Sequence, residues 1–248
     1  HSAKGLPLAS IEEVFQEVEA GNADFGVVPV ENSGQGTIQS TLDMFLTSSL
    51  KICGEVELGI HQYLLGRTGR IEDIERVYAH PQSLAQCRAW LRQNLPKAEL
   101  VPTPSNADAA RRARNADDAA ALAGESAGHV YGLKTIAGPV NDRADNTTRF
   151  LVLGRELLPT CGHDRTSLLV FVNDQPGALF GILKPFADAG LSLNRIESRP
   201  AHTRRWEYAF FIDVSGHVDQ PEMQAALQQL GAFASSVKIL GSYPVAVL

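Results

Sequence analysis

Residues 24–37 read DFGVVPVENSGQGT, and this stretch indicates the class of fold. The apolar run Phe25–Val30 has the length of a buried strand. It ends at three polar residues, which are Glu31, Asn32 and Ser33. In open α/β sheets, ligands bind beyond the carboxyl ends of the strands, where loops meet helix N-termini. The stretch therefore predicts a ligand site, and the alternative is that Asn32 or Ser33 only caps the next helix.

Strands and helices alternate on both sides of this stretch. The apolar periodicity predicts strands at 25–30, 51–56, 62–65, 76–79, 100–102, 119–123 and 146–153. It predicts helices at 11–19, 34–46, 81–95, 106–116 and 125–131. Strands that alternate with helices form a mainly parallel sheet that helices cover on both faces. Residues 1–157 are therefore expected to form an α/β domain.

The order of predicted strands and helices changes after a polar, turn-rich linker at 158–165. Strands are then predicted at 166–172, 193–198, 207–214 and 237–240, and helices at 176–189 and 221–233. This order is βαββαβ, the arrangement of ferredoxin-like domains. We therefore predict a second domain of a different kind at 166–248.

The composition excludes several classes of protein. The chain has 248 residues, of which 44% are hydrophobic and 20% are charged, and a formal net charge of −6 with no long basic run. This balance is typical of a globular protein and argues against nucleic-acid binding. No apolar run is long enough to span a membrane. No export signal with a basic and then an apolar segment opens the sequence.

Cysteine and histidine usage indicates a reducing compartment and no metal site. Cys53, Cys87 and Cys161 are odd in number and far apart, which argues against a disulfide framework. The seven histidines form no ligand pair at the spacing that metal sites use. We therefore expect a cytoplasmic protein that holds no metal.

A second polar cluster, NTTRF at 146–150, opens the last strand of the first domain. Side chains alternate along a strand, so Thr148 and Arg149 face opposite ways. If this strand runs antiparallel to 25–30, Thr148 meets Glu31 across one cleft, and if it runs parallel the two residues lie at opposite ends. The alternative is a core strand with a polar entrance. A shared site requires the antiparallel arrangement, which we therefore predict.

Three motifs in this order resemble the prephenate dehydratase family: PVENSGQGTIQSTLD at 29–43, AHPQSLAQC at 79–87 and NTTRFLVLG at 146–154. The second domain resembles an ACT regulatory domain through two signatures, Gly177, Ala178, Leu179 and Phe180, and Glu197, Ser198, Arg199 and Pro200. The resemblance covers nearly the whole chain. It implies two α/β lobes like those of a type II periplasmic binding protein, with the site between them, followed by the ACT domain.

The resemblance also implies an activity and the residues that carry it. Members of the family are lyases that convert prephenate to phenylpyruvate, with loss of water and carbon dioxide, in phenylalanine biosynthesis and without a cofactor. The implied site consists of Thr148 as the central hydroxyl, Arg149 and Phe150 in support, Glu31, Asn32 and Ser33 on the facing wall, and Gln86. Ala79 stands where many members have serine before the His-Pro pair.

The chemistry suits these residue types. Prephenate carries two carboxylates and a ring hydroxyl, and aromatisation drives the loss of the ring carboxylate and the hydroxyl. The site has to hold a dianion and help hydroxide depart, which requires hydrogen-bond donors. Thr148 is expected to donate a hydrogen bond to the leaving oxygen. Glu31 is a candidate proton source if it lies in a dry pocket.

ACT domains of this type bind their amino acid where two such domains meet. The resemblance therefore implies a homodimer or homotetramer that is inhibited by phenylalanine. A helix that opens at 176–178 offers N–H groups to a carboxylate, and Gly177 lets a ligand approach the backbone closely. The alternative is an ordinary helix start. We predict that phenylalanine binds here, away from Thr148.

The family begins with a strand and a Gly-Pro-x-Gly-Thr-Phe-Ser loop, and this sequence begins at His1, after the place of that loop. The C-terminal sequence resembles bifunctional bacterial forms that carry chorismate mutase upstream, so we expect part of a longer protein. Two other functions stay open. One is a non-catalytic, two-lobed phenylalanine-sensing module, and the other is an arogenate dehydratase.

Overall fold

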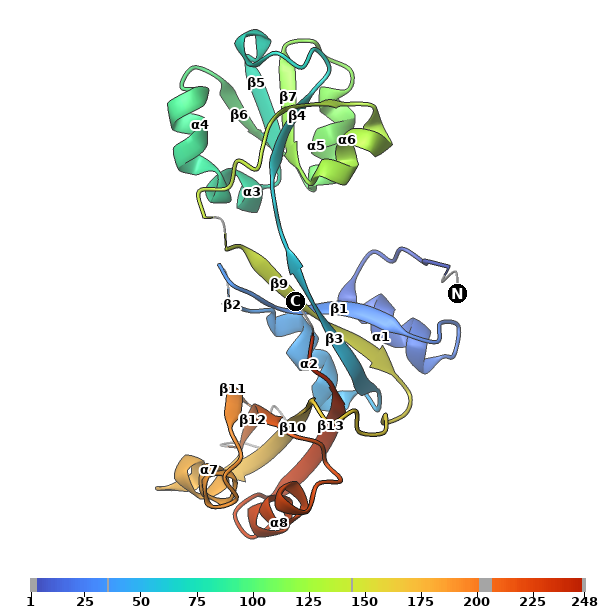
Figure 1. Cartoon of the computed structure of the whole chain (residues 1–248), viewed down its shortest axis with the longest axis vertical. Helices are drawn as coiled ribbons and strands as arrows, with labels where there is room; N and C mark the ends of the chain where they lie inside the picture. The colour runs from blue at the N-terminus through green and yellow to red at the C-terminus, as the bar shows by residue number, and fades with distance from the viewer. Residues whose placement is uncertain (1–3, 35, 144, 201–206, 247–248) are drawn as a thin grey trace. The chain divides into compact units, whose positions relative to one another are not determined.

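The computed structural model describes residues 4–34, 36–143, 145–200 and 207–246. The chain forms two compact units, one made of His1–Leu58 with Thr148–Leu248 and the other of Gly59–Thr147 (Figure 1). The start of the sequence at His1, on which we based the expectation of a preceding loop, lies outside the described residues.

The first unit contains a four-stranded sheet in the order β2-β1-β9-β3, which we name the N-terminal sheet. Its strands are β1 (Gly26–Asn32), β2 (Gly36–Thr37), β3 (Lys51–Gly59) and β9 (Thr147–Gly154). β1 and β9 run antiparallel, with Asn32 opposite Thr148 and Glu31 opposite Arg149. The predicted strand direction is therefore confirmed.

Helices α1 (Ile11–Glu19) and α2 (Gln39–Thr47) pack against the N-terminal sheet in one hydrophobic cluster. α1 begins after Ser10, whose hydroxyl accepts a hydrogen bond from the Glu13 N–H at 3.1 Å. Apolar residues at helical spacing bury one side of α1, with Phe15 fully inside the core. The helix was predicted at these same residues.

The chain turns back after β1 instead of entering a helix directly. We predicted a helix at 34–46, but β2 pairs antiparallel with β1, and α2 begins only at Gln39. Residue 35 lies outside the described residues. Gly36 has a φ of +78°, a left-handed conformation that glycine adopts without strain. The turn that glycine permits here therefore replaces the first part of the predicted helix.

The polar residues after β1 shape this turn. The side-chain oxygen of Asn32 accepts the Gly34 N–H at 3.0 Å, a local bond that is typical of asparagine in turns. The N-cap of α2 is Ile38, which makes no side-chain capping bond. The alternative that Asn32 or Ser33 caps the helix is therefore wrong.

The second unit contains a five-stranded sheet in the order β6-β5-β7-β4-β8. Its strands are β4 (Tyr63–Gly66), β5 (Arg76–Ala79), β6 (Glu99–Pro102), β7 (Ala119–Ala123) and β8 (Lys134–Ala137). Its helices are α3 (Pro81–Gln86), α4 (Arg88–Asn94), α5 (Asn106–Ala113) and α6 (Glu125–Tyr131), with a short 3-10 helix, η1 (Ile71–Asp73).

The strand directions correct the prediction of a mainly parallel sheet. β5 pairs parallel with β6 and β7, but β4 pairs antiparallel with β7 and with β8. β1 is also antiparallel to both of its neighbours in the N-terminal sheet. A parallel pair requires a long crossover, usually a helix, whereas β4 connects to β5 through η1 and short loops. The successive strands β5, β6 and β7 are separated by helices and run parallel as predicted, whereas β4 and its successor β5 have no such helix between them and run in opposite directions.

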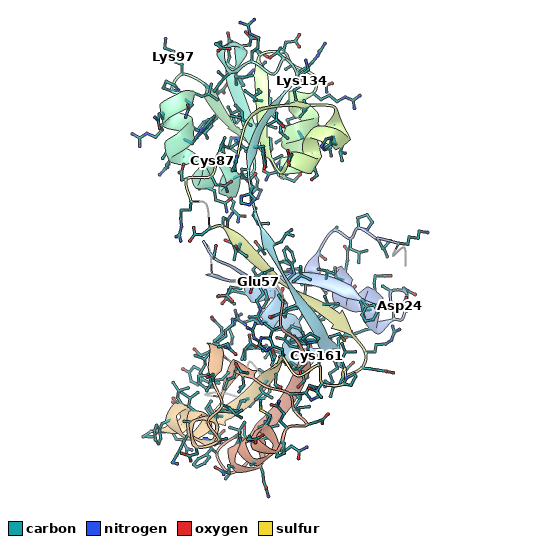
Figure 2. The ribbon with its side chains drawn as sticks, viewed as in Figure 1. Asp24, Glu57, Cys87, Lys97, Lys134 and Cys161 are labelled. Atoms are coloured by element: carbon teal, nitrogen blue, oxygen red, sulfur yellow. The ribbon has the colours of Figure 1, made fainter. Side chains whose placement is uncertain are left out.

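The helix predicted at 81–95 is two helices, which meet at Cys87 (Figure 2). The carboxylate of Asp142 accepts the N–H groups of Ala89 at 2.8 Å and Trp90 at 3.0 Å, which satisfies the start of α4. The Cys87 thiol is buried, and burial raises its pKa to about 12. Cys87 therefore serves the core and is not a reactive thiol.

The first unit also contains an antiparallel sheet in the order β11-β12-β10-β13, which we name the C-terminal sheet. Its elements are β10 (Asp164–Asn173), α7 (Ala178–Asp188), β11 (Leu193–Pro200), β12 (Glu207–Ser215), α8 (Pro221–Leu230) and β13 (Ser236–Pro244). This is the βαββαβ order that we predicted. α7 and α8 bury one face of the sheet in a cluster that includes Val170, Ile182 and Leu230.

The other face of the C-terminal sheet packs on the N-terminal sheet. Leu169, Phe211 and Tyr243 share one hydrophobic cluster with Phe15 of α1 and Val28 of β1. Within the first unit, the two sheets therefore form a single core.

Backbone contacts tighten this junction. Lys51 of β3 donates from Nζ to the Ile239 carbonyl at 2.7 Å, and Lys238 of β13 donates to the Phe45 carbonyl at 2.9 Å. Burial, followed by the charge of Lys51, lowers the pKa of Lys238. Lys51 therefore holds β3 close to β13, and Lys238 holds β13 close to the end of α2.

The segment expected as a linker is tied to the C-terminal sheet at its end. The Asp164 carboxylate accepts the Thr160 hydroxyl at 2.6 Å and the N–H groups of Cys161 and Gly162, both at 3.0 Å. Burial alone would raise the pKa of Asp164, but these hydrogen bonds outweigh it and lower the pKa below its ordinary value. The entry to β10 is therefore an ordered turn.

Candidate active site

The structure brings together Asn32 and Thr148, which lie 116 positions apart in the sequence. The side-chain amide of Asn32 donates from Nδ2 to the Thr148 hydroxyl oxygen at 2.8 Å. Both side chains are buried, with 5% of Asn32 and 8% of Thr148 exposed. Gly34 holds the other end of the amide by donating its N–H to Oδ1. Asn32 is therefore oriented from both ends.

This geometry prepares Thr148 as a hydrogen-bond donor. A hydroxyl has one hydrogen to donate and two lone pairs that accept. Because Thr148 accepts from Asn32, its own hydrogen remains for a different acceptor. An accepted bond also polarises the hydroxyl and strengthens the bond that it donates. The arrangement suits a group that stabilises negative charge on a departing oxygen.

Glu31 faces away from this pair, which corrects the expectation that Glu31 and Asn32 line one wall. Cross-strand partners point to the same face, so Glu31 shares a face with Arg149, and Asn32 shares the opposite face with Thr148. The Glu31 carboxylate lies 3.9 Å from Arg149 and 3.7 Å from Arg195. Its side chain is 43% exposed, so it does not lie in the dry pocket that a proton source requires.

Arg149 was expected to support the substrate site, and its guanidinium is instead directed toward the C-terminal sheet. It donates to Glu55 and to Asp213, both at 2.8 Å. Phe150 is half-buried on the strand after Thr148, opposite Pro29. Side chains alternate along β9, so Phe150 shares the face of Thr148 and Arg149 does not. Phe150 therefore offers apolar surface near the hydroxyl.

The remaining expected site residues occupy different places. Ser33 is exposed in the turn that follows β1. Gln86 is half-buried at the end of α3 in the second unit, where its carbonyl accepts the Asp142 N–H at 2.8 Å. Ala79, at the end of β5, is fully buried.

A polar cluster at the carboxyl end of β5 was missed from the sequence. Asn106, the first residue of α5, donates to the Ser83 hydroxyl at 2.8 Å and accepts the His80 N–H at 3.0 Å. Ser83 is buried, and His80 caps α3 through its ring nitrogen. This is the end of a parallel pair where ligands bind in α/β sheets. The position of Asn106 shortly after a predicted strand was the available signal.

The first expected phenylalanine signature lies at the start of α7. Gly177 is the N-cap and has a φ of +82°, which residues with a side chain rarely adopt. The Ala178 N–H bonds to the Gln175 carbonyl, so it is not one of the free N–H groups that we expected there. Leu179 and Phe180 are exposed, with 69% of Phe180 open to solvent.

The second signature, on β11, is divided between two faces. Glu197 accepts the Thr37 hydroxyl at 2.9 Å, and Arg199 donates to Asp43 of α2 at 2.5 Å. Ser198 and Pro200 alternate with these residues and are exposed. The charged residues of this signature therefore contact the N-terminal sheet and α2 within the same chain.

In the described part of the chain, no three histidine, cysteine, aspartate or glutamate residues gather as a metal site would require. Among these residues there is also no helix that is long and apolar enough to cross a membrane.

Comparison with known proteins agrees with the motifs. Residues 1–157 match the family model for prephenate dehydratase, and residues 166–232 match the ACT domain model. The bifunctional chorismate mutase/prephenate dehydratase of Stutzerimonas stutzeri is 49% identical over 249 residues, covering 100% of this chain and 68% of that protein.

Two solved structures are similar over nearly the whole chain. The prephenate dehydratase of Arthrobacter aurescens, solved in complex with L-Phe, has a TM-score of 0.87 at 36% identity and covers 96% of this chain and 80% of its own. GqqA, described as a novel type of quorum quenching acylase, has a TM-score of 0.89 at 31% identity and covers 97% of this chain and 89% of its own. The fold of this chain is thus that of prephenate dehydratases, with a two-lobed α/β part followed by the ACT domain.

Proposed function

We propose, from the premise that the chain belongs to the prephenate dehydratase family and carries an ACT domain, that it converts prephenate to phenylpyruvate under control by phenylalanine. The observation that carries the proposal is the buried hydrogen bond between Asn32 and Thr148, which unites two motifs distant in the sequence. Residues 1–157 are assigned to catalysis and residues 166–248 to regulation.

The reaction breaks two bonds on one ring. The bond to the ring carboxylate breaks and releases carbon dioxide, and its electron pair enters the ring. The bond to the ring hydroxyl breaks at the opposite carbon, and the departing hydroxide takes a proton to become water. The ring is then aromatic, and the pyruvyl side chain is unchanged. No electrons are gained or lost overall, so the reaction requires no redox partner.

Thr148 donates its hydrogen bond to the oxygen that departs. Negative charge grows on this oxygen as its bond to the ring breaks, and a fixed donor stabilises that charge more than the neutral starting hydroxyl. Asn32 holds the Thr148 oxygen, so the donor does not have to reorganise during the reaction. Phe150 provides apolar surface beside the ring, and Ser33 and Gln86 are assigned to polar contacts with the substrate.

The activity is tested by incubating the protein with prephenate and following the absorbance of phenylpyruvate. We expect phenylpyruvate to form at a rate proportional to protein concentration. Arogenate, offered in parallel, should react more slowly, and its product would be phenylalanine. Phenylalanine binding without any product from either substrate would establish the non-catalytic sensing module. Faster reaction of arogenate would identify an arogenate dehydratase.

Phenylalanine is the proposed effector, and it is assigned to the start of α7, away from Thr148. It inhibits by binding one arrangement of the protein more tightly than another, because a ligand shifts an equilibrium only by its differential affinity. We propose that two copies of the chain complete the effector site, as a homodimer or within a homotetramer. The proposed setting is the cytoplasm.

Replacing Gly177 with valine should weaken phenylalanine binding by at least about tenfold, since a β-branched residue disfavours the positive φ that shapes this loop. Turnover without phenylalanine should stay nearly intact. Calorimetry with phenylalanine measures the affinity. Gly190→Val is the matched control, because Gly190 has a φ of +69° at the other end of α7. Equal affinities in the two variants would place the effector site elsewhere.

A further inference from the structure

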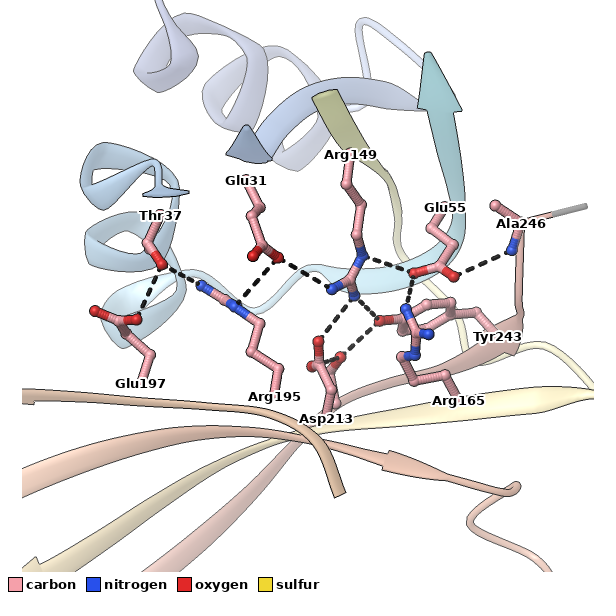
Figure 3. A network of polar contacts seen from close by, with 11 residues as sticks. Glu31, Thr37, Glu55, Arg149, Arg165, Arg195, Glu197, Asp213, Tyr243 and Ala246 are labelled. Carbon is pink, nitrogen blue, oxygen red and sulfur yellow. Dashed lines mark hydrogen bonds and ion pairs between the residues drawn. The ribbon is translucent and has the colours of Figure 1, made fainter. Parts of the chain in front are cut away.

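A cluster of charged and hydroxyl side chains joins the two sheets of the first unit (Figure 3). We name it the Arg149 cluster, and its members are Arg149, Glu55, Arg165, Ser167, Asp213 and Tyr243. Arg149 donates from Nε to Glu55 at 2.8 Å, and from Nη2 to Asp213 at 2.8 Å and to Tyr243 at 3.2 Å. One guanidinium is therefore held by β3 of its own sheet and by β12 and β13 of the C-terminal sheet.

The partners of Arg149 are themselves fixed. Glu55 also accepts from Arg165 of β10 at 2.6 Å and from the Ala246 N–H at 3.1 Å. Asp213 accepts the Ser167 hydroxyl at 2.6 Å. Each carboxylate thus has more than one donor, and the C-terminal sheet supplies donors to both.

The cluster is buried. The side chain of Glu55 is 0% exposed, that of Asp213 6% and that of Arg149 10%. Burial alone would lower the pKa of Arg149, but the charges of Asp213 and Glu55 outweigh it and raise the pKa above its ordinary value. A charge taken out of water requires well-placed partners. The position of the guanidinium therefore follows the positions of the two carboxylates.

A second contact reaches the N-terminal sheet from β11. Arg195 lies 3.7 Å from the Glu31 carboxylate and donates to the Thr37 hydroxyl at 3.1 Å. Thr37 in turn donates to Glu197, two residues further along β11. The strand that carries the second expected phenylalanine signature thus touches the ends of β1 and β2.

These two contacts flank the proposed catalytic pair. Thr148 is followed in β9 by Arg149, which is hydrogen-bonded to Asp213. Asn32 is preceded in β1 by Glu31, which forms an ion pair with Arg195. Glu31 and Arg149 are cross-strand partners, and so are Asn32 and Thr148. The register of β1 and β9 shifts just before these pairs, between Pro29 and Glu31. Such irregularities occur next to active sites, where they re-aim side chains.

We infer that Arg149 and Glu31 are positioning residues for the Asn32–Thr148 pair, and that the C-terminal sheet sets the geometry of this pair through Asp213 and Arg195. This inference rests on the proposed function. A movement of β11 displaces Glu31 through Arg195, and a movement of β12 displaces Arg149 through Asp213. Glu31 and Arg149 are the sequence neighbours of Asn32 and Thr148, so the positions of these two residues change as well. Phenylalanine binding to the C-terminal domain thereby weakens the donor at the leaving oxygen.

The test replaces Asp213 with asparagine, which keeps the size and one acceptor but removes the charge that holds Arg149. The readout is the ratio of kcat without and with saturating phenylalanine, because this ratio does not depend on the fraction of folded protein. We expect a ratio of at least about 5 for the unmutated protein. For Asp213→Asn we expect a ratio below about 2, a kcat lower by about tenfold and a KM within about twofold.

Asp188→Asn is the matched control, because Asp188 forms an exposed ion pair with Lys184 on α7. It should keep the unmutated ratio. Calorimetry should show that Asp213→Asn still binds phenylalanine, so that the lost response is a loss of coupling. A kcat ratio in Asp213→Asn equal to that of the unmutated protein would overturn the inference. If Asp213→Asn does not fold, the same kcat ratio is measured for Arg195→Gln, and the same loss of the response is expected. The partner Glu31 is partly solvated, so loss of the Arg195 charge should not prevent folding.

The same assays separate this inference from the proposed function. In a Thr148→Ala background, Asp213→Asn should lower the residual turnover by less than about twofold, because both changes act on one hydroxyl. A further tenfold loss in that background would show that Asp213 acts elsewhere and would overturn the inference. If the unmutated protein does not convert prephenate, the proposed function fails first.

Discussion

Thr148→Ala should lower the turnover of prephenate by at least about 100-fold, the usual cost of removing one fixed donor to a developing oxyanion. The substitution removes the hydroxyl that Asn32 orients at 2.8 Å, and no other part of Thr148 takes part in the chemistry. The protein should stay folded, with a loss of stability of about 1 kcal/mol, because only one hydroxyl and one methyl group are removed. Steady-state kinetics and urea denaturation measure the two effects.

Two further substitutions at Thr148 separate chemistry from packing. Thr148→Val keeps the shape and loses the hydroxyl, so its turnover should match that of the alanine variant. Thr148→Ser keeps the hydroxyl and should retain turnover within about tenfold of the unmutated protein. Near-normal turnover in Thr148→Val would refute the catalytic assignment. An unfolded Thr148→Ala protein would support the alternative that this is a core strand with a polar entrance.

Gly241→Ala should destabilise the protein by about 3 kcal/mol, near the upper end for overpacking a core. A Cβ atom at Gly241 would lie 2.2 Å from the Ile52 carbonyl oxygen and 2.9 Å from the Ile52 carbonyl carbon. These are backbone atoms of β3, so they cannot move aside as a flexible side chain does. The two sheets would have to separate at this point, and the core that they share would loosen.

Gly54→Ala is the control for this prediction, because Gly54 lies on the same strand as Ile52. A Cβ atom there meets only Val152, at 3.8 Å, which is ordinary van der Waals contact. We expect its stability to stay within about 0.5 kcal/mol of the unmutated protein. The midpoint of urea denaturation at an unchanged slope measures both variants. Equal midpoints for Gly241→Ala and Gly54→Ala would contradict the close approach of β13 to β3.

The elements and their order could be predicted from the sequence. β7 and α1 begin and end where the apolar pattern placed them, and the C-terminal domain has the predicted βαββαβ order. The antiparallel direction of β1 and β9 followed from one requirement, that two polar motifs share a site, although Thr148 was expected to meet Glu31 and lies opposite Asn32. Periodicity and local turn chemistry identify the elements because both depend on neighbours a few residues apart.

Strand direction elsewhere was predicted less well. β4 was assigned to a parallel sheet because the segments around it alternate between strand and helix. β4 leads into β5 without a crossover helix and runs opposite to it, so β4 is antiparallel to β7, which pairs parallel with β5. Likewise, a helix was predicted at 34–46, and the pairing of β2 with β1 was missed. A strand of two residues carries too little pattern to be recognised.

The sequence by itself determined the family, the two kinds of domain and the antiparallel direction of the strands that carry Glu31 and Thr148. Only the tertiary structure decided which way Glu31 and Arg149 face. The register shift before Glu31 changes which residues of β1 share a face, and no local pattern marks it. The partners of Arg149 lie 64 to 94 positions away, on strands of two sheets. A buried charge requires partner groups that only folding brings close to it, so the role of Arg149 depends on residues that are distant in the sequence.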